Sequence, residues 1–290
     1  DADTIKKHEK TRADKEDDRV RHIDTLSAHD EPVFLTYRAV REIDAAIEEA
    51  KRPAPDVDLV TADGVAHQLW VVPPALGARI EALFGAVPAL YVPDGHHRSA
   101  AASRVHARRK RMPGEHDAFL AVVFPHDQMQ ILAYNRLVRD PRGRPAGAIL
   151  EEIGKVMDVK PATSAKPGHP LSFGIYAGGR WYHAHARPGS FAEGDPVAAL
   201  DCSIVQDQIL APIFGIQDPR RDRNVDFVGG IRGVEELERR VREEGWSIAL
   251  HLYPTRIEQL IAVSDAGKLM PPKSTWFEPK LRSGLFVHAF

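Results

Sequence analysis

The chain has a single cysteine, no long apolar run and no excess of positive charge. Because Cys202 stands alone among 290 residues, an internal disulfide and a structural zinc site of closely spaced cysteines are excluded. No stretch of about 18 apolar residues occurs, so no membrane helix is predicted. The formal net charge of -2 gives no support to a nucleic-acid or membrane surface, where an excess of basic residues would be expected. We therefore expect a cytoplasmic protein whose partners are small molecules or protein chains. A homodimer is one assembly that the sequence allows.

Three well-known functional motifs are also missing. The chain contains no Walker-type Gly-Lys-Ser/Thr loop, no glycine fingerprint for dinucleotides and no Gly-x-Ser-x-Gly nucleophile elbow. The large nucleotide-binding and hydrolase classes that carry these motifs are therefore not predicted.

Helical and strand patterns alternate along the chain, which predicts an α+β fold. Hydrophobic residues make up 43% of the sequence, enough for a large core in one or two domains. Helices are predicted where apolar residues recur every three or four positions, and strands where apolar runs are short or alternate. The predicted helices span residues 14–28, 40–50, 75–84, 96–110, 197–214, 234–244 and 256–266, and the predicted strands span 32–37, 59–62, 65–72, 89–92, 119–124, 130–137, 171–176, 180–186, 225–228 and 247–253.

Turns between the predicted strands indicate mixed sheets with hairpins. Hairpins are predicted at Asp63-Gly64, at Ala177-Gly178-Gly179 and at residues 125–128, which separate the strands 119–124 and 130–137. The Pro-, Gly- and Arg-rich stretch 140–145 is the predicted domain boundary. We expect a nucleotide-binding domain at residues 1–140 and a second, smaller α+β domain at 141–290, whose C-terminal Lys-Ser-Thr motif (residues 273–275) returns to the site of the first.

The most informative cluster, Asp94 to Arg98, joins a predicted strand to a predicted helix. A carboxylate, two imidazoles (His96 and His97) and a guanidinium surround Gly95. Cations at a helix start oppose the helix dipole unless an anion compensates, and the free N–H groups of a helix start bind phosphate. The pattern therefore favours a phosphate site. In a purely structural interpretation, Asp94 caps the helix and the histidines lie on the surface.

Two further clusters lie near the ends of the chain. Lys7-His8-Glu9-Lys10-Thr11 places a carboxylate among cations, which suits a general base but is also typical of a solvated loop. Residues 270–280 include Lys273, Ser274 and Thr275, whose ammonium and hydroxyl groups suit a phosphate. A connecting loop with a packed Trp-Phe pair explains this third cluster equally well.

Together these motifs resemble the bacterial domain-of-unknown-function family 1015 (DUF1015). The matching motifs are Lys7 to Thr11 with Lys15 to Arg19, Glu31 to Leu35, Asp94 to Arg98, and Met270 to Lys280, so the resemblance covers nearly the whole chain. Members are usually longer at the front, and we expect residues to precede Asp1. The family is in turn similar to the free-serine kinases of the ParB and sulfiredoxin fold, which implies that fold for residues 1–140.

The resemblance to the kinases implies that this chain transfers a phosphoryl group from ATP or ADP, with Mg²⁺, to a hydroxyl acceptor such as free L-serine. It implies Glu9 as the base, Asp94 and His97 as further catalytic residues, and Asp94 as the magnesium ligand. It also places Gly95, His97 and Arg98 on the turn that holds nucleotide phosphates. From their residue types, we predict Lys7, His8, His96, Lys273, Ser274 and Thr275 as further nucleotide and phosphate ligands, although the Lys-Ser-Thr motif has no counterpart in these kinases. Two alternatives are a ParB-type nucleotide-binding switch without kinase activity and a metal-dependent hydrolase with His8, Glu9, His96 and His97 as ligands.

Overall fold

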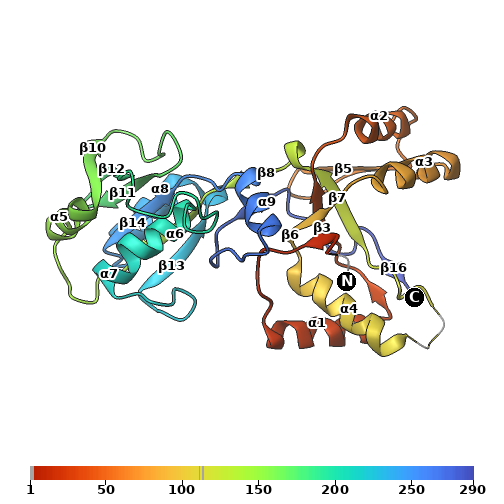
Figure 1. The fold of residues 1–290 in the computed structure, drawn as a ribbon, viewed down its shortest axis with the longest axis horizontal. Coiled ribbons are helices and arrows are strands. Elements are labelled where there is room, and N and C mark those ends of the chain that lie inside the picture. Colours follow the sequence, from red (N-terminus) through yellow and green to blue (C-terminus); the bar gives the residue numbers. More distant parts are fainter. Residues whose placement is uncertain (1–2, 111, 113) are drawn as a thin grey trace.

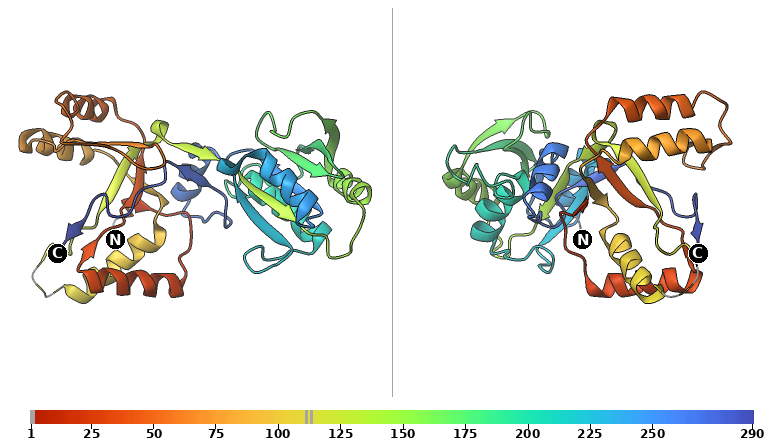
Figure 2. Two further views of the ribbon diagram at one scale, coloured as in Figure 1. Left: turned by 180° about the vertical axis from the view of Figure 1, so that it is seen from behind. Right: turned by 45° about the vertical axis from the view of Figure 1, so that its right-hand side comes forward.

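The computed structural model describes residues 3–110, 112 and 114–290, which form an elongated molecule with two lobes (Figure 1). The first lobe is built on a four-stranded sheet and the second on a six-stranded sheet. The N- and C-terminal ends both lie at the first lobe (Figures 1 and 2). The predicted α+β class with mixed sheets is confirmed.

The four-stranded sheet of the first lobe mixes parallel and antiparallel pairs. Its order is β1 (Ile5–Lys6), β6 (Leu90–Asp94), β3 (Val33–Tyr37) and β7 (Ala121–Pro125). The pairs β1–β6 and β3–β7 are parallel, whereas β3 and β6 are antiparallel. Strand β3 is buried along its whole length, as its mostly apolar run, interrupted only by Thr36, predicts.

Two helices, α1 (Ala13–Leu26) and α4 (His96–Arg109), pack against each other in the first lobe (Figure 2). Their contact is built from small and branched apolar side chains at helical spacing: Val20, Ile23, Ala101 and Val105. The packing fixes the start of α4 beside the chain that leads into α1. Helices α2 (Arg41–Ala50) and α3 (Pro74–Phe84) and the hairpin of β4 (Val57–Val60) and β5 (Ala66–Leu69) complete this lobe.

The six-stranded sheet of the second lobe is antiparallel throughout. Its order is β10 (Met157–Ala162), β12 (Arg180–Ala186), β11 (Ser172–Ala177), β14 (Ile248–Leu252), β9 (Tyr134–Val138) and β13 (Val225–Gly229). Strands β11 and β12 meet at the Gly178-Gly179 turn, so this predicted hairpin is confirmed, as is the one at Asp63-Gly64.

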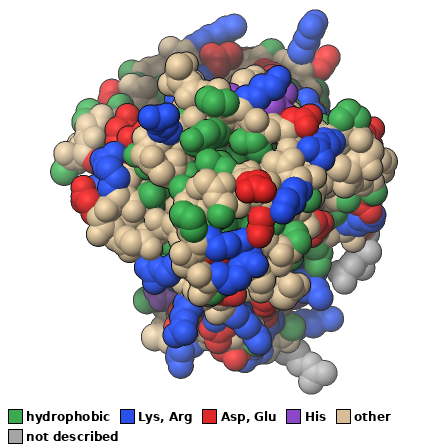
Figure 3. Space-filling view, turned by 90° about the vertical axis from the view of Figure 1, so that its left-hand side faces the viewer, with side chains coloured by type: hydrophobic (Ala, Val, Ile, Leu, Met, Phe, Trp, Pro, Cys, Tyr) green, Lys and Arg blue, Asp and Glu red, His purple; other side chains and the backbone are tan. Residues whose placement is uncertain are grey.

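Helices cover both faces of this sheet. One face packs on α5 (Ala146–Val156) and on the helical stretch of α6 (Asp201–Val205), a π-helix (Gln206–Leu210) and α7 (Ala211–Phe214). At the end that carries α5 and β10, hydrophobic side chains gather near the centre of the surface among charged ones (Figure 3).

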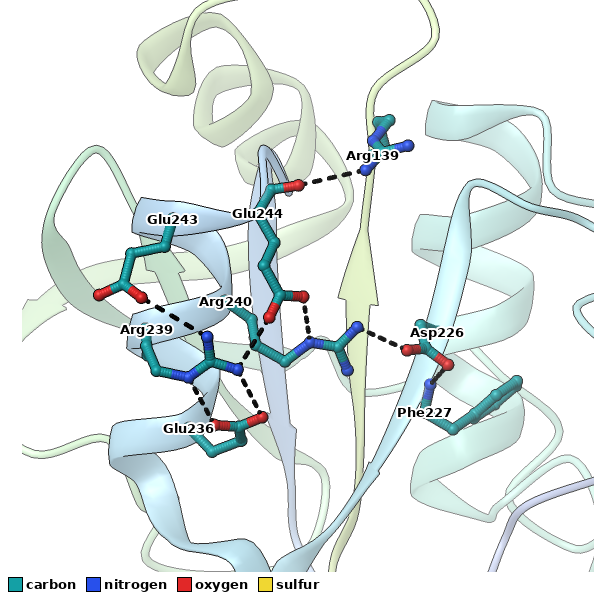
Figure 4. A network of polar contacts seen from close by, with 8 residues as sticks. All are labelled: Arg139, Asp226, Phe227, Glu236, Arg239, Arg240, Glu243 and Glu244. Carbon is teal, nitrogen blue, oxygen red and sulfur yellow. Dashed lines mark hydrogen bonds and ion pairs between the residues drawn. The ribbon is translucent and has the colours of Figure 1, made fainter.

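The opposite face packs on α8 (Gly233–Glu243), a strongly amphipathic helix. Its outer face carries a charged network (Figure 4), in which Arg240 donates to Asp226 of β13 at 2.7 Å and to Glu244 at 2.8 Å. Most of these groups are solvated, so each pair contributes at most about 1 kcal/mol to stability.

The C-terminal part of the chain returns to the first lobe. It contains α9 (Ile257–Asp265), β15 (Trp276–Glu278), which pairs with β8 (Gln130–Leu132), and β16 (His288–Ala289), which pairs with β2 (Ala28–His29). One hydrophobic cluster runs from Phe34 of the first sheet through Phe277 to Leu250 of the second.

The hairpin predicted for residues 119–124 and 130–137 is wrong. Strand β7 pairs with β3, β8 pairs with β15, and β9 lies in the other sheet between β13 and β14. A short 3₁₀ turn, His126–Gln128, leads from β7 to β8. The partners of these strands lie far away in sequence, where short-range turn chemistry cannot indicate them.

Strand β9 ends before residue 140 but belongs to the six-stranded sheet. The C-terminal chain runs through α9, which lies between the lobes in Figure 1, to β16, which pairs with β2 of the first lobe. The 3₁₀ turn Gly230–Arg232 leads into α8.

No helix among the described residues is both long enough and apolar enough to cross a lipid bilayer.

Candidate functional site

The N-terminal chain passes the start of α4 and encloses a cavity with it. Because β1 pairs parallel with β6, the residues that follow β1 lie beside those that follow β6. The resulting cavity has a volume of 780 Å³. Its lining consists of Asp3, Thr4, Ile5, Lys7, Glu9, Lys10, Thr11, Glu16, Val92, His96, Ser99, Ala100, Ser103, Arg104 and Leu269.

One face of α4 forms a wall of this cavity. His96, Ser99, Ala100 and Ser103 follow the spacing of three and four residues that places side chains on one helix face. Arg104, one residue further, donates to Glu16 at 3.3 Å and to Asp17 at 2.6 Å, and so ties α4 to α1. The helix therefore presents an imidazole and two hydroxyls to the cavity.

The opposite wall comes from the segment that connects β1 to α1. Lys7, Glu9 and Lys10 line the cavity, and Glu9 is exposed. The hydroxyl of Thr11 bonds to the Glu16 carboxylate at the start of α1. The cavity thus brings a carboxylate and two ammonium groups in front of the first turn of α4.

His8 points away from solvent and packs on His96. The two rings meet edge to face with centroids 4.6 Å apart, and the side chains are 2% and 8% exposed. Burial lowers the pKa of His8 to about 3 and that of His96 to about 4. Both imidazoles are therefore neutral near pH 7. The backbone carbonyl of His8 also accepts a hydrogen bond from Met270 at 2.8 Å.

Gly95 makes the turn between β6 and α4 possible. It is the residue before the first helical turn and has φ +94°, a value that side chains of L residues rarely adopt. A Cβ atom here would lie 3.3 Å from Val33 Cα and 3.2 Å from Arg98 Nε. Glycine is therefore needed both for its backbone angle and for its size.

Asp94 does not cap α4, so the capping interpretation is wrong. Its carboxylate accepts the Gly95 N–H at 2.7 Å and lies 3.2 Å from Lys280 Nζ and 3.7 Å from Arg98 Nη2. Burial alone would raise the pKa of Asp94, but Lys280, Arg98 and the Gly95 N–H together lower it. The cap position is taken by Gly95, which has no side chain to offer.

His97 and Arg98 bond to neighbouring backbone rather than lining the cavity. His97 Nε2 accepts the N–H of Arg12 at 3.0 Å, and Arg98 Nη1 donates to the carbonyl of Pro32 at 2.5 Å. These contacts fix the turn to the N-terminal segment and to the start of β3. Of the predicted site residues, the structure brings Lys7, Glu9 and His96 into the cavity, with His8 behind them.

The Lys-Ser-Thr motif lies between the lobes and does not line the cavity. Ser274 is buried, donates to the Pro271 carbonyl at 2.6 Å and lies 3.1 Å from the sulfur of Cys202. The ammonium of Lys273 lies over the Tyr134 ring at 5.4 Å. Thr275 leads into β15, where Trp276 and Phe277 both pack on aromatic rings. Lys280, beyond the motif, is the residue that reaches the Asp94 turn.

Sequence reasoning missed four residues at or near the site. Ser99, Ser103 and Arg104 follow His96 at helical spacing, a pattern that could have found them. Lys280 ends the Met270 to Lys280 cluster, but its contact with Asp94 could not be found in this way, because only the return of the C-terminal chain brings the two together.

A second cavity of 630 Å³ lies between α5 and β10, at the end of the molecule seen in Figure 3. Its charged lining residues are Glu151, Asp158, Lys160 and Arg187, of which Arg187 already bonds to Asp158 and to the carbonyls of Lys155 and Gly154. No group of three metal-ligating side chains occurs in this groove within the described residues.

Solved structures with similar folds have low sequence identity to this chain. SbnI with a C-terminal truncation, from Staphylococcus aureus, matches with a TM-score of 0.51 and 12% identity, covering 99% of this chain and 85% of its own. A free serine kinase in complex with AMP matches with a TM-score of 0.45 and 11% identity, covering 95% and 84%. A conserved hypothetical protein from Pyrococcus furiosus matches with a TM-score of 0.43 and 10% identity, covering 97% and 90%.

No protein with a curated description matches the sequence. The family model described as "Protein of unknown function (DUF1015)" matches residues 1–203, a range that contains β1, the Asp94 turn and every cavity-lining residue except Leu269. The resemblance found from the sequence motifs is thereby confirmed over residues 1–203, whereas the Met270 to Lys280 motif lies beyond the matched range. The chain belongs to the DUF1015 family.

Proposed function

We propose that the cavity beside α4 binds a nucleotide and that the chain transfers a phosphoryl group from it to a hydroxyl group of a small acceptor. One observation carries this proposal: Lys7 and Glu9, from the start of the chain, line the same cavity as His96 at the start of α4. Phosphoryl transfer needs positioned phosphates, neutralised charge and an aimed acceptor oxygen, and these residue types supply all three.

The phosphates would lie at the start of α4. Lys7 and Lys10 bring positive charge to the cavity, and Ser99 brings a hydroxyl donor. The first N–H groups of a 14-residue helix add the positive end of the helix dipole. Within the proposal, Gly95, His97 and Arg98 hold the turn in place, and Arg98 reaches a phosphate only by leaving the Pro32 carbonyl.

Glu9 would act as the general base that takes the proton of the acceptor hydroxyl. It is exposed, lines the cavity and lies next to His8, whose buried ring packs on His96. Base catalysis of this kind contributes about 10²- to 10⁴-fold to the rate.

Asp94 fits a supporting role toward Mg²⁺. A magnesium ion that travels with nucleotide phosphates needs only one or two protein carboxylates, and Asp94 is the carboxylate of the turn. Lys280 and Arg98 already balance its charge, so the phosphates would supply most of the binding. When bound, the ion would neutralise phosphate charge. The hydroxyl of Ser274 is used within the protein, and residues 273–275 are left out of the proposed site.

A screen of phosphoryl donors and acceptors tests the proposal. Full-length protein is incubated with Mg²⁺ and ATP or ADP in the presence of amino acids, including L-serine, or small alcohols, and products are followed by phosphorus NMR. A new phosphomonoester signal that depends on both donor and acceptor is the expected result. Nucleotide binding without any phosphorylated acceptor would favour a ParB-type switch instead, and no binding of either nucleotide would contradict the proposed site.

A further inference from the structure

We infer that His8, Glu9 and His96, beside the same cavity, bind a divalent transition-metal ion such as Zn²⁺, Co²⁺ or Fe²⁺. One nitrogen from each ring and one carboxylate oxygen all lie within 4.8 Å of one another. Among the described residues this is the only group of three such side chains that meets this distance. A small shift of side chains would bring the three atoms onto one ion.

Two ring nitrogens at this place have no other use in the protein. Nδ1 of His8 and Nε2 of His96 are buried and lack a hydrogen-bond partner within the described part of the chain. Buried polar atoms are nearly always hydrogen-bonded, because leaving one without a partner costs about 1–3 kcal/mol. The two rings pack edge to face, and one nitrogen of each ring lies within 4.8 Å of one nitrogen of the other. A metal ion would accept both lone pairs.

The donor types select the kind of metal. Two imidazoles and one carboxylate suit Zn²⁺, Co²⁺ or Fe²⁺, whereas Mg²⁺ prefers oxygen ligands only. Because Glu9 and His96 also line the 780 Å³ cavity, a bound ion would face the cavity with at least one position open. Three protein ligands and an open position are typical of zinc sites that bind substrate or water.

The metal would compete with the proposed base chemistry. A carboxylate that ligates a metal ion is not free to accept a proton, so an ion at this site would occupy Glu9. On this point, which rests on the proposed function, Zn²⁺ should slow phosphoryl transfer and a chelator should restore it. Metal binding itself needs no nucleotide and can be tested alone.

Cobalt titration of the untagged full-length chain tests the site directly. Co²⁺ is added to metal-free protein without nucleotide, and visible d–d absorption reports nitrogen and oxygen ligation. We expect one bound Co²⁺ per chain, displaced by Zn²⁺. His96→Ala and Glu9→Gln should each weaken Co²⁺ binding by about 100-fold or more, since even the loss of an outer-shell partner typically costs 10- to 100-fold. His67→Ala, in the hairpin of β4 and β5, should leave binding unchanged.

The variants keep the test decisive if one of them does not fold. His96 is buried, so circular dichroism must first show that His96→Ala is native-like; Glu9 is exposed, and Glu9→Gln changes only a surface group. No stoichiometric Co²⁺ binding to the wild-type chain would overturn the inference, and so would binding that survives Glu9→Gln unchanged. Because the readout is metal binding, either result leaves the phosphoryl-transfer proposal to its own NMR test.

Discussion

Gly95 determines how the chain turns from β6 into α4 and therefore where the cavity wall begins. Its φ of +94° is strained for any residue with a Cβ atom, at a cost of about 1–2 kcal/mol. We expect Gly95→Ala to lower the free energy of unfolding by at least this amount and to weaken nucleotide binding, because Val33 and Arg98 crowd the added methyl group.

The matched control for this prediction is Gly143→Ala. Gly143 also has a positive φ, +64°, but nothing lies within 4 Å of its would-be Cβ atom. Urea unfolding and nucleotide titration of both variants separate the two effects. Equal nucleotide affinity in the two variants would contradict a role of the Gly95 turn in the site.

Lys7 is the residue whose charge we expect to matter most for nucleotide affinity. Lys7→Ala removes one ammonium from the cavity wall, so the dissociation constant of ATP or ADP should rise about tenfold. Lys15→Ala, on the exposed face of α1, serves as the control. Calorimetric titration checks both. Identical affinities would place the phosphates elsewhere.

Residue types alone indicated the Asp94–Arg98 and Lys7–Thr11 clusters, because charged and imidazole groups crowd at a predicted helix start or beside a carboxylate. The same reasoning could not tell which side chains share a cavity. His96 and His97 are neighbours in sequence, yet one lines the cavity and the other accepts the N–H of Arg12. Adjacent helix residues point about 100° apart, so a cluster in sequence divides between two faces in space.

At the scale of helices and strands, elements with a strong local pattern were predicted well. The helices α2, α3, α4, α8 and α9 and the Gly178-Gly179 hairpin occur close to their predicted positions. Helix α5 and strand β10 were missed, as were the two-residue strands β1, β2 and β16, which are too short to show any periodicity. The pairings of β7, β8 and β9 depend on distant partners, and no local turn indicates those.

His251 on β14 makes a pH-dependent contribution to the stability of the six-stranded sheet. Burial, together with the nearby charges of Lys166 and His183, lowers the pKa of His251 to about 4. In the unfolded chain a histidine binds its proton at about pH 6.5. Between these values the unfolded chain holds more protons, so the stability present above pH 6.5 is lost as the pH falls toward 4.

Replacing His251 should reduce this acid sensitivity. We expect wild type to lose on the order of 2 kcal/mol more than His251→Asn between pH 7.5 and pH 4.5, measured by urea unfolding at both values. His67→Asn, in the β4–β5 hairpin, controls for the general effect of losing a histidine. If the unfolding free energies of wild type and His251→Asn change equally between the two pH values, His251 does not cause the acid sensitivity.

At the scale of the whole molecule, Asp265, the last residue of α9, connects the C-terminal part of the chain to the N-terminal strand. Its carboxylate accepts hydrogen bonds from Lys6 of β1 at 2.8 Å, from Tyr91 of β6 at 2.9 Å and from Arg38 at 3.4 Å. Asp265 therefore connects the returning C-terminal chain to the two strands that lead into the cavity. No local pattern in the sequence indicated this connection.

Removing the Asp265 carboxylate should destabilise the contacts that connect α9 to strands β1 and β6. Because the site is partly exposed, we expect Asp265→Ala to lower the free energy of unfolding by about 1–2 kcal/mol and to weaken nucleotide binding as well. Asp158→Ala, which removes an exposed ion pair with Arg187 in the second lobe, should change either quantity by less than about 1 kcal/mol. Thermal unfolding and nucleotide titration of the two variants check this. An Asp265→Ala chain as stable as Asp158→Ala would contradict it.

The most direct measurement compares nucleotide binding and phosphoryl transfer in wild type and Glu9→Gln, with metal-chelated buffer plus excess Mg²⁺ so that no transition metal occupies the site. Glu48→Gln, on the exposed face of α2, is the control. If Glu9 is the base at the start of α4, transfer falls about 10²- to 10⁴-fold while the nucleotide dissociation constant stays within a factor of about three. A Glu9→Gln chain that transfers phosphate at the wild-type rate would contradict the account.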